Sequence, residues 1–124
     1  MANDTKNFKV SEFACKCCGK NNIDQRVINM AQVIREYLGV PVKINSGYRC
    51  TKHNKEVGGV ANSKHTKGLA ADLSCKKGQT ALWNATQKLY AEGKLPDLDY
   101  CRRRGYKTFI HIDCGGKRNN RWDG

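Results

Sequence analysis

The segment from residue 25 to residue 38 carries the apolar pattern that most restricts the fold of this chain. Its apolar side chains recur every three or four positions, as on the buried face of a helix. They are Val27, Met30, Ala31, Ile34, Tyr37 and Leu38. Asp24 precedes them as a suitable N-cap, and Gly39 followed by Pro41 predicts the end of the helix. The same spacing predicts a second helix over residues 80–92.

Four shorter segments have the alternation or the apolar content of strands. They are residues 42–45, 69–75, 98–103 and 108–114, the last two joined by a hairpin around Gly105. Residues 47–67, which are rich in Gly, Asn, Ser, Lys and His, are predicted to form a loop. This order of elements predicts an α+β fold with a small antiparallel sheet flanked by helices.

The length of 124 residues fits one domain, which is expected to span residues 1–124. Within it, residues 8–114 hold the motifs described below, residues 1–10 are interpreted as a polar lead-in, and residues 115–124 as a basic tail. No apolar run approaches the ~18 residues of a membrane span, and residues 1–10 lack the apolar core of a signal peptide. We expect a monomeric protein that is made in the cytoplasm.

Lysine and arginine outnumber aspartate and glutamate by 23 to 11, which gives the chain a net charge of +12. An excess of this size favours an anionic partner, either nucleic acid or the phosphate- and carboxylate-rich envelope of a bacterium. The basic residues are spread along the sequence. The tight run from Arg102 to Arg104 is interpreted as a solvated hairpin, and Lys117, Arg118 and Arg121 lie in the tail. Composition alone does not choose between these partners.

Seven cysteines are a high count for a chain of this length. Buried, reduced thiols are the ordinary expectation for a protein made in the cytoplasm. A disulfide, for example between Cys101 and Cys114 on the predicted hairpin, is one alternative if the protein works outside the cell. The other is a structural zinc site, although the C-x-C-C spacing is not the usual one for a zinc knuckle. Its ligands would be Cys15, Cys17, Cys18 and Cys50.

His65, Asp72 and His111 are the candidate ligands of a catalytic metal. His65 and Asp72 are seven residues apart, so they are not helix neighbours, but a turn at Gly68 can bring the next strand back beneath the loop. Two imidazoles and one carboxylate suit Zn²⁺, and a fourth position left to water is the catalytic arrangement. Each residue also has a plainer interpretation: a solvated histidine, a carboxylate paired with a lysine, and a buried core histidine.

Four motifs follow one another along the chain. They are Ser46-Gly-Tyr-Arg49, His53-Asn-x-x-Val-Gly-Gly59, Ser63-x-His65-x-x-Gly68-x-Ala-x-Asp72 and His111-Ile-Asp113. Together they resemble the M15 family of zinc D-alanyl-D-alanine peptidases, whose relatives include phage endolysins and the amino-terminal signalling domain of Hedgehog proteins. The resemblance extends from Phe8 to Cys114. It is strongest to a compact branch that begins with a phrase like Phe8-Lys-Val-Ser-Glu-Phe13 and a cysteine-rich turn.

The resemblance implies a zinc site formed by the two histidines and the aspartate named above, and the fold shared by Hedgehog and the D-alanyl-D-alanine peptidases. It also implies that Arg49 faces the cleft, where its guanidinium would hold a substrate carboxylate or polarise the scissile carbonyl. Ser63 and Tyr48 are expected in the same cleft. His53 is interpreted as a surface residue of the loop.

The position of the general base departs from the family pattern. Many relatives have a Glu or Asp three residues before the last metal ligand, or a His two residues before it. Thr108 and Phe109 occupy these positions here. Asp113, two residues beyond that ligand and on the same strand face, is the predicted catalytic base, with an orienting contact to a ligand as the alternative. Asp99 and Tyr100 are further candidates.

These inferences predict a zinc metallopeptidase that hydrolyses peptide bonds of bacterial peptidoglycan, as a D,D-carboxypeptidase or an endopeptidase. Its partners would be the stem peptide and the anionic cell wall, and the lack of a signal peptide would fit a phage or prophage lysis enzyme or a tail-associated one. Two alternatives stay open: an inactive zinc-containing module that binds the cell wall, and a basic nucleic-acid-binding protein with a cysteine-rich zinc site. The second does not account for the motif from Ser63 to Asp72.

Overall fold

The computed structural model describes residues 2–60, 63–116 and 120–124. Helix α1, Gln25–Leu38, has the predicted bounds. The Asp24 carboxylate accepts a hydrogen bond from the backbone N–H of Arg26 at 2.9 Å, and Gly39 ends the helix in left-handed backbone at φ 68°. The predicted apolar stripe is buried except at Tyr37, which is 47 % exposed.

The sheet has five strands in the order β1-β2-β4-β3-β5. The strands are β1 Val42–Ser46, β2 Ala70–Cys75, β3 Tyr100–Arg102, β4 Ile110–Asp113 and β5 Trp122–Asp123. Neighbouring strands are antiparallel except β3 and β5, which are parallel. The four predicted strands are present, the last two shorter at both ends than expected, and the predicted α+β fold class is confirmed.

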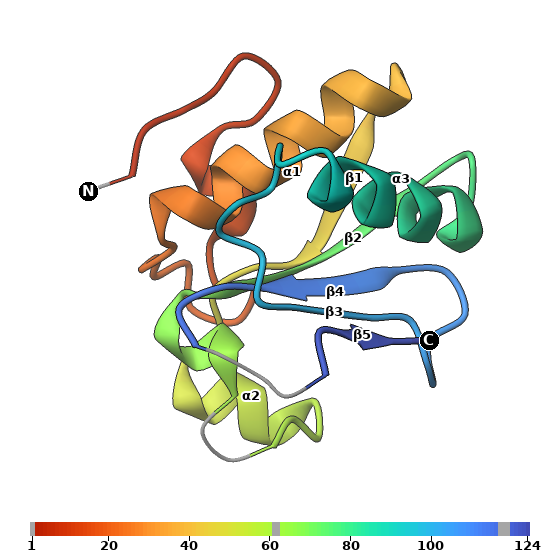
Figure 1. Cartoon of the computed structure of the whole chain (residues 1–124). Coiled ribbons are helices and arrows are strands. Elements are labelled where there is room, and N and C mark those ends of the chain that lie inside the picture. The colour runs from red at the N-terminus through yellow and green to blue at the C-terminus, as the bar shows by residue number, and fades with distance from the viewer. Residues whose placement is uncertain (1, 61–62, 117–119) are drawn as a thin grey trace.

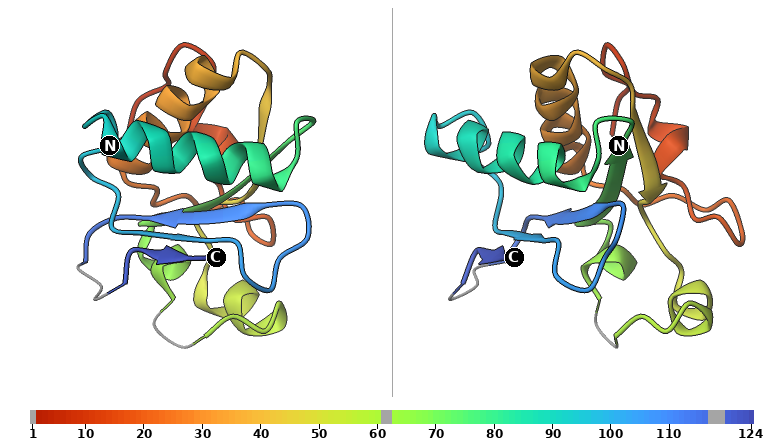
Figure 2. Two further views of the ribbon diagram at one scale, coloured as in Figure 1. Left: turned by 45° about the vertical axis from the view of Figure 1, so that its right-hand side comes forward. Right: turned by 90° about the vertical axis from the view of Figure 1, so that its right-hand side faces the viewer.

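Two helices cover one face of this sheet. Helix α3, Gln79–Ala91, packs beside α1, and both contact β2 (Figures 1 and 2). The fully buried side chains of this core include Ile34, Leu73, Leu82, Ile110 and Ile112. Burying one such side chain stabilises a fold by roughly 1.5–3 kcal/mol. Since strand side chains alternate, the residues between these apolar ones point to the other face of the sheet.

Residues 47–67 do not form the single loop that their composition predicts. Helix α2, Thr51–Glu56, and the 3-10 helix η2, Lys64–Lys67, lie side by side within this stretch, away from α1 and α3 (Figures 1 and 2). Both helices are shorter than the window in which helical periodicity can be recognised, so composition was misleading. None of the described helices is long and apolar enough to cross a membrane.

The predicted polar lead-in is part of the packed structure. Phe8 is buried beside Phe13 with ring centroids 5.9 Å apart, and Phe13 ends the 3-10 helix η1, Val10–Phe13. The Gln32 side chain of α1 accepts a hydrogen bond from the Thr5 hydroxyl at 2.8 Å. A single apolar residue among polar ones has no periodic signal, which is why the sequence pattern did not mark Phe8 as core.

The predicted basic tail joins the sheet through β5. Trp122 packs edge-on against Trp83 of α3 with ring centroids 5.6 Å apart. The Arg121 guanidinium lies 4.3 Å from the ring centroid of Tyr90, which is also on α3. Lys117 and Arg118, the other basic residues of the predicted tail, lie outside the described residues.

Candidate active site

Four polar residues form a row across the sheet on the face opposite α1 and α3. Asp72 of β2 lies directly opposite His111 of β4, and His111 in turn lies opposite Arg102 of β3. On its other side Asp72 lies opposite Ser46 of β1, just beyond an irregularity in the pairing. Directly opposed residues of antiparallel strands point to the same face. Strand register therefore brings one candidate histidine and the candidate aspartate together.

His65 reaches this row from η2. The Ser63 hydroxyl accepts a hydrogen bond from the backbone N–H of His65 at 3.2 Å, and Gly68 ends η2 in left-handed backbone at φ 73°. A Cβ atom at Gly68 would overlap the carbonyl oxygen of Asn22. Glycine is therefore required both for the backbone conformation and for the close approach. The turn returns the chain to Asp72 as the sequence predicted.

The possible metal-binding atoms of His65, Asp72 and His111 face one another. The Oδ1 atom of Asp72 is 3.3 Å from Nε2 of His65 and 3.1 Å from Nδ1 of His111. Nitrogen and oxygen ligands of a tetrahedral zinc ion are about 3.3–3.6 Å apart, because each lies about 2.0–2.2 Å from the metal. The other nitrogen of His65, Nδ1, is 2.8 Å from the carbonyl oxygen of Gly47. In a neutral imidazole Nδ1 then carries the proton and Nε2 is free to bind, so the three residues fit zinc.

Asp72 is held in its charged form. Burial by itself raises the pKa of a carboxyl group, but the hydrogen bonds and charges of His111 and His65 outweigh it. They hold the pKa of Asp72 well below its ordinary value of 3.8. The second oxygen, Oδ2, lies 3.4 Å from the Arg49 guanidinium. The carboxylate is therefore ready to bind a cation near neutral pH.

His111 lies between two carboxylates. Its Nδ1 atom faces Asp72, and its Nε2 atom is 2.8 Å from Oδ2 of the fully buried Asp113. Burial lowers the pKa of an imidazole, yet the hydrogen bonds to Asp113 and Asp72 outweigh burial and raise the pKa of His111 above its ordinary value of 6.5. Carboxylates that accept the remaining N–H of a metal-binding histidine fix its ring and tautomer. The Asp113 carboxylate is placed to make this contact with His111.

Arg49 is fixed beside these residues by three side chains. Its Nε atom donates to Ser46 Oγ at 3.0 Å, and its terminal nitrogens donate to Asn54 Oδ1 at 3.2 Å and to Asp72 Oδ2 at 3.4 Å. Asn54 is buried, and a Cβ atom at Gly59 would overlap its side-chain amide. The motif that ends in Gly59 therefore holds Asn54 against Arg49.

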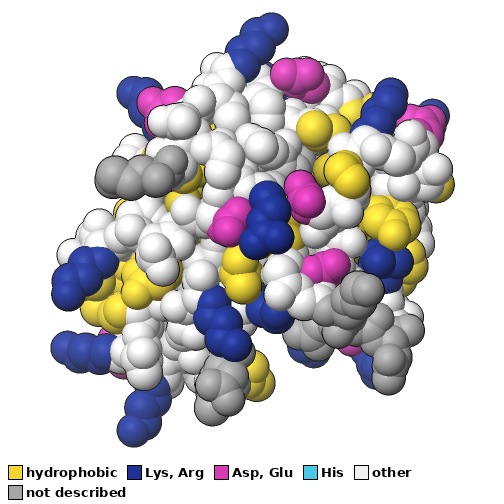
Figure 3. All heavy atoms as spheres, turned by 60° about the vertical axis from the view of Figure 1, so that its left-hand side comes forward, with side chains coloured by type: hydrophobic (Ala, Val, Ile, Leu, Met, Phe, Trp, Pro, Cys, Tyr) yellow, Lys and Arg dark blue, Asp and Glu magenta, His cyan; other side chains and the backbone are white. Residues whose placement is uncertain are grey.

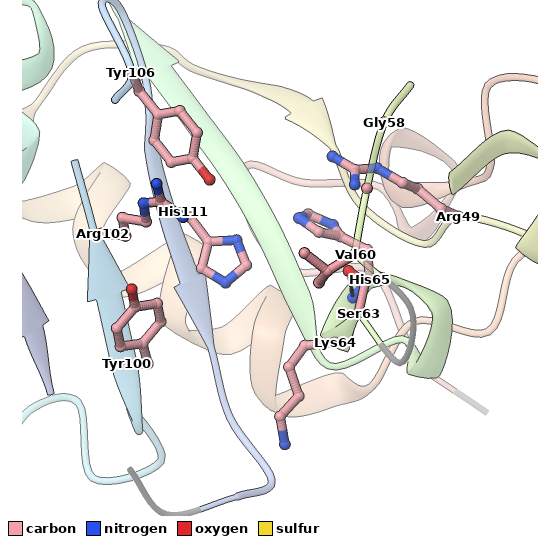
Figure 4. A pocket seen from close by; sticks show the side chains of 11 residues that line it. Arg49, Gly58, Val60, Ser63, Lys64, His65, Tyr100, Arg102, Tyr106 and His111 are labelled. Carbon is pink, nitrogen blue, oxygen red and sulfur yellow. Dashed lines mark hydrogen bonds between the residues drawn. The ribbon is translucent and has the colours of Figure 1, made fainter. Parts of the chain in front are cut away.

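A cleft of about 390 Å³ opens over these residues. Its lining includes the two histidines and Arg49, Ser63, Lys64, Tyr100, Arg102 and Tyr106. Figure 4 shows the Tyr106 hydroxyl directed into the space between His111 and Arg49, whereas the Lys64 amino group points away from both imidazoles. Burial raises the pKa of Tyr106. Its phenol therefore keeps its proton near neutral pH and can donate a hydrogen bond into the cleft.

A family model described as peptidase M15 matches residues 6–113, which is most of the chain. This chain belongs to the peptidase M15 family. The resemblance carried by the four sequence motifs is thereby confirmed at the level of the family, and the chain is assigned as a peptidase. Peptidases of this family depend on zinc, and His65, Asp72 and His111 form a possible metal-binding group here. No curated protein matches the sequence.

The structure of this M15 peptidase brings most of the predicted site residues together. Arg49, Ser63 and Tyr100 line the cleft beside the metal-binding group. Tyr48 and Asp99 are not among the described residues that line it. The Tyr48 N–H donates to the carbonyl oxygen of Phe13 at 2.8 Å, and the Asp99 carboxylate accepts a hydrogen bond from the Gly116 N–H at 2.6 Å.

Arg102, Tyr106 and Asn54 belong to the site of the M15 peptidase although the sequence assigned them no role there. The sequence predicts Arg102 as part of a solvated hairpin, but in the structure it lines the cleft, and its guanidinium lies 5.1 Å from the ring centroid of Tyr106. Its position opposite His111 is a matter of strand register, which the sequence does not reveal. Asn54 did have a signal, since it stands in one of the family motifs.

All seven cysteines of the M15 peptidase are free thiols. Cys101 pairs across the sheet with Ile112 and not with Cys114, so the disulfide considered from the sequence is not formed. Burial raises the pKa of both Cys101 and Cys114, the latter to about 12. The structural zinc site, which was the other alternative for the cysteines, has a possible ligand set in the structure. The sulfur atoms of Cys15, Cys17, Cys18 and Cys50 all lie within 4.8 Å of one another.

Proposed function

We propose that this M15 peptidase is a zinc D,D-carboxypeptidase that hydrolyses the terminal peptide bond of peptidoglycan stem peptides. The observation that carries the proposal is the position of the Arg49 guanidinium. It lies 3.4 Å from the Asp72 carboxylate of the metal-binding group and lines the same cleft. A cation in this position favours a substrate whose free carboxylate is close to the scissile bond. A peptide that ends in D-alanyl-D-alanine has this property.

His65, Asp72 and His111 would hold the zinc ion. When bound there, zinc would act as a Lewis acid and would lower the pKa of a bound water molecule to about 7. The protein contributes the orientation of its ligands. The Gly47 carbonyl holds the ring of His65, and the Asp113 carboxylate holds the ring of His111, at 2.8 Å in both cases. Both contacts keep a proton on the ring nitrogen remote from Asp72.

Arg49 is the proposed binding group for the substrate carboxylate. Each terminal nitrogen of a guanidinium carries two N–H donors. The contacts to Asn54 and Asp72 use one donor on each terminal nitrogen. Among the described residues the second donor on each has no partner, which leaves both for a substrate, in the parallel arrangement that binds both oxygens of a carboxylate. Asn54 and Ser46 hold the guanidinium so that less freedom is lost when substrate binds.

Tyr106 is the proposed hydrogen-bond donor to the carbonyl oxygen of the scissile bond. Its hydroxyl is directed between His111 and Arg49 (Figure 4), and burial raises its pKa so that the proton stays on the phenol. A fixed donor at the place where negative charge develops lowers the barrier to hydrolysis. We assign Asp113 to holding His111 in place and not to proton transfer.

The proposed place of action is the bacterial cell wall, reached after release of the protein in phage or prophage lysis. A net charge of +12 favours attraction to anionic wall polymers. On the face drawn in Figure 3, lysine and arginine side chains are spread among other residues and do not gather in one stripe. On this face the distribution suits diffuse attraction better than the continuous basic track expected of a nucleic-acid-binding surface.

A zinc-containing module without catalytic activity is the second candidate. One observation favours it. Among the described residues that line the cleft, there is no aspartate or glutamate. A carboxylate that lines the cleft beside the metal is the usual acceptor of a proton from the attacking water. Activity on a defined peptide therefore decides between the two candidates.

The test uses a synthetic stem pentapeptide that ends in D-alanyl-D-alanine, with products identified by mass. The matched control substrate has the same sequence and an amidated C-terminus. We expect the zinc-loaded wild type to release D-alanine from the free acid and to cleave the amide about 10–100-fold more slowly, because hydrogen bonds to charged groups contribute about 1.5–3 kcal/mol. His65→Ala is expected to be inactive on both.

Four results would change the assignment. Equal cleavage of the acid and the amide, or cleavage of cross-linked peptidoglycan alone, identifies an endopeptidase. Zinc-loaded wild type that releases nothing, where a known D,D-peptidase is active, favours the inactive module. Full activity in His65→Ala overturns the zinc mechanism.

A further inference from the structure

We propose that Cys15, Cys17, Cys18 and Cys50 form a second, structural zinc site. The first three lie on the turn that follows η1, and Cys50 directly precedes helix α2. The site would join these two segments, which are far apart in the sequence. It is separate from the metal-binding group of the active site, and none of its four residues lines the described part of the cleft.

The distances between the sulfur atoms carry the proposal. All four lie within 4.8 Å of one another, and the Sγ atoms of Cys17 and Cys50 are 3.8 Å apart. Four sulfur atoms at about 2.3 Å from a tetrahedral zinc ion are separated by about 3.8 Å. A covalent S–S bond is about 2.0 Å long, and all four cysteines are free thiols. The cluster therefore matches a metal-binding arrangement better than a disulfide.

Backbone N–H groups are directed at two of the sulfur atoms. The N–H of Cys50 donates to Sγ of Cys15 at 3.4 Å, and the N–H of His53 donates to Sγ of Cys50 at 3.4 Å. Such bonds stabilise the thiolate form, which is the form that binds metal. The turn itself is closed by the Gly19 N–H, which donates to the carbonyl oxygen of Cys15 at 2.8 Å. The protein thus holds the ligand set in place.

The spacing of these cysteines in sequence is not the usual one for a zinc knuckle, and the tertiary structure shows how four sulfur atoms can still meet. A zinc knuckle uses two ligands two residues apart on one turn. Here the turn supplies three sulfur atoms, two of them from the adjacent residues Cys17 and Cys18. The fourth comes from Cys50, 33 positions beyond Cys17. The backbone N–H of Tyr48 donates to the carbonyl oxygen of Phe13 at 2.8 Å, which brings the two segments together.

Cys17 also belongs to a second possible group, with His53 and Glu56. The set of four sulfur atoms is favoured because thiolates are the preferred ligands of structural zinc, whose sites are closed by four protein ligands. Glu56 is exposed and offers a hard oxygen ligand instead. His53→Ala separates the two sets, since His53 contributes only backbone to the proposed site.

The experiment measures bound metal in the full-length protein, purified under reducing conditions. We expect the wild type to hold two zinc ions per chain, and His65→Ala to hold one. The double variant Cys17→Ser/Cys18→Ser, at two exposed positions, is expected to lose the other ion. Cys75→Ser, a cysteine outside the cluster, is the matched control and is expected to hold two, as is His53→Ala.

Replacement of zinc by cobalt(II) identifies the ligands independently of activity. Thiolate ligands give an intense charge-transfer band in the near ultraviolet, which imidazole and carboxylate ligands do not. We expect this band in the wild type, His65→Ala, His53→Ala and Cys75→Ser, and its loss in the double cysteine variant. The measurements on wild type and His65→Ala stand even if the double variant does not fold.

The proposal is overturned if cobalt-loaded wild type lacks the thiolate band, or if His65→Ala binds no metal. It is also overturned if the double cysteine variant retains as much zinc as Cys75→Ser. Loss of the band in His53→Ala would transfer the site to the set of Cys17, His53 and Glu56. Because none of these readouts uses turnover, they stand or fall separately from the proposed peptidase activity.

Discussion

His111 and Asp113 are joined by a hydrogen bond of 2.8 Å between Nε2 and Oδ2, within a single strand. The alternation of β4 places both side chains on one face of the sheet. The other ring nitrogen of His111 faces Asp72 at 3.1 Å. A ring held in this way keeps one tautomer, so we infer that Asp113 acts on the metal site through His111 and does not act on the substrate.

The first prediction concerns the replacement Asp113→Asn. Asparagine keeps the shape of the side chain but loses the charge that holds the remaining proton of His111. We expect zinc affinity to fall about 10–100-fold, the usual effect of weakening such a contact. Turnover at saturating zinc should stay within about tenfold of wild type. Competition titration with a chelator measures the affinity, and steady-state assays measure the turnover.

A different outcome would identify Asp113 as the catalytic base that the sequence predicts. Loss of a general base typically lowers turnover by about 10²–10⁴-fold. Such a loss in Asp113→Asn, at unchanged zinc affinity, would identify Asp113 as the proton acceptor and contradict its assignment as a positioning residue.

The second prediction is that zinc binding to the active site strengthens as the pH rises. In the metal-free protein Asp113 and Asp72 raise the pKa of His111 above 6.5. At a pH below that raised pKa, zinc must therefore displace a proton from His111. At a pH above it, His111 has no such proton to lose. Affinity measured at a series of pH values should rise and then level off. In Asp113→Asn the rise should occur at lower pH, because one of the two carboxylates is gone; an unchanged profile contradicts this explanation.

The third prediction concerns the stability of the metal-free protein. Because the pKa of His111 is raised, its contribution to the free energy of unfolding is complete below pH 6.5, the ordinary pKa of histidine. That contribution is lost as the pH rises through the raised pKa. For Asp72 the pKa is lowered, so its contribution is complete above 3.8 and is lost as the pH falls. Both contributions to stability are complete together between pH 3.8 and pH 6.5.

Urea unfolding of the zinc-free protein, compared with His111→Gln, measures this contribution. The difference in the free energy of unfolding between the two proteins should be largest between pH 3.8 and pH 6.5 and should shrink at higher pH. A difference that is constant over the whole range would show that the charge on His111 does not contribute to stability.

The fourth prediction is that Arg49→Lys lowers kcat/KM on the free-acid pentapeptide about 10–100-fold. Lysine keeps the positive charge but cannot bind both oxygens of a carboxylate in parallel. Arg104→Lys is the matched control, since Arg104 is exposed and pairs with Asp123 at 2.9 Å, and it should behave as wild type. Equal losses on the acid and the amide would mean that Arg49 does not bind the substrate carboxylate.

The fifth prediction compares two glycines that both have positive φ angles. These are 73° at Gly68 and 68° at Gly39. Nothing lies within 4 Å of a Cβ atom at Gly39, whereas one at Gly68 would overlap the backbone of Asn22. Gly39→Ala should cost about 1–2 kcal/mol through backbone conformation alone. Gly68→Ala should cost about 1–3 kcal/mol more through overpacking. It should also weaken zinc binding, because His65 lies in the same turn.

Denaturant unfolding of the two alanine variants checks this comparison. Similar free energies of unfolding for both would mean that the segment around Asn22 moves aside at little cost. In that case the close approach at Gly68 does not constrain the position of His65.

The elements that the sequence predicted well have local signals. Helix α1 begins after Asp24 and ends at Gly39 because a cap and a left-handed residue act on their own immediate neighbours. Strands β1 and β2 and helix α3 were located to within a residue for similar reasons. In contrast, α2 is too short to have a recognisable period, and so is the two-residue β5, where Trp122 contacts Trp83 of α3.

The sequence by itself determined the M15 family, the α+β class and the candidate metal ligands, since these depend on motifs and on side-chain periodicity. The tertiary structure decided that Asp113 lies behind His111, that Arg102 and Tyr106 line the cleft, and that the four cysteines meet. The physical reason is the same in each case. Strand register and the approach of separate turns depend on how distant segments pack together, and no stretch of neighbouring residues contains that information.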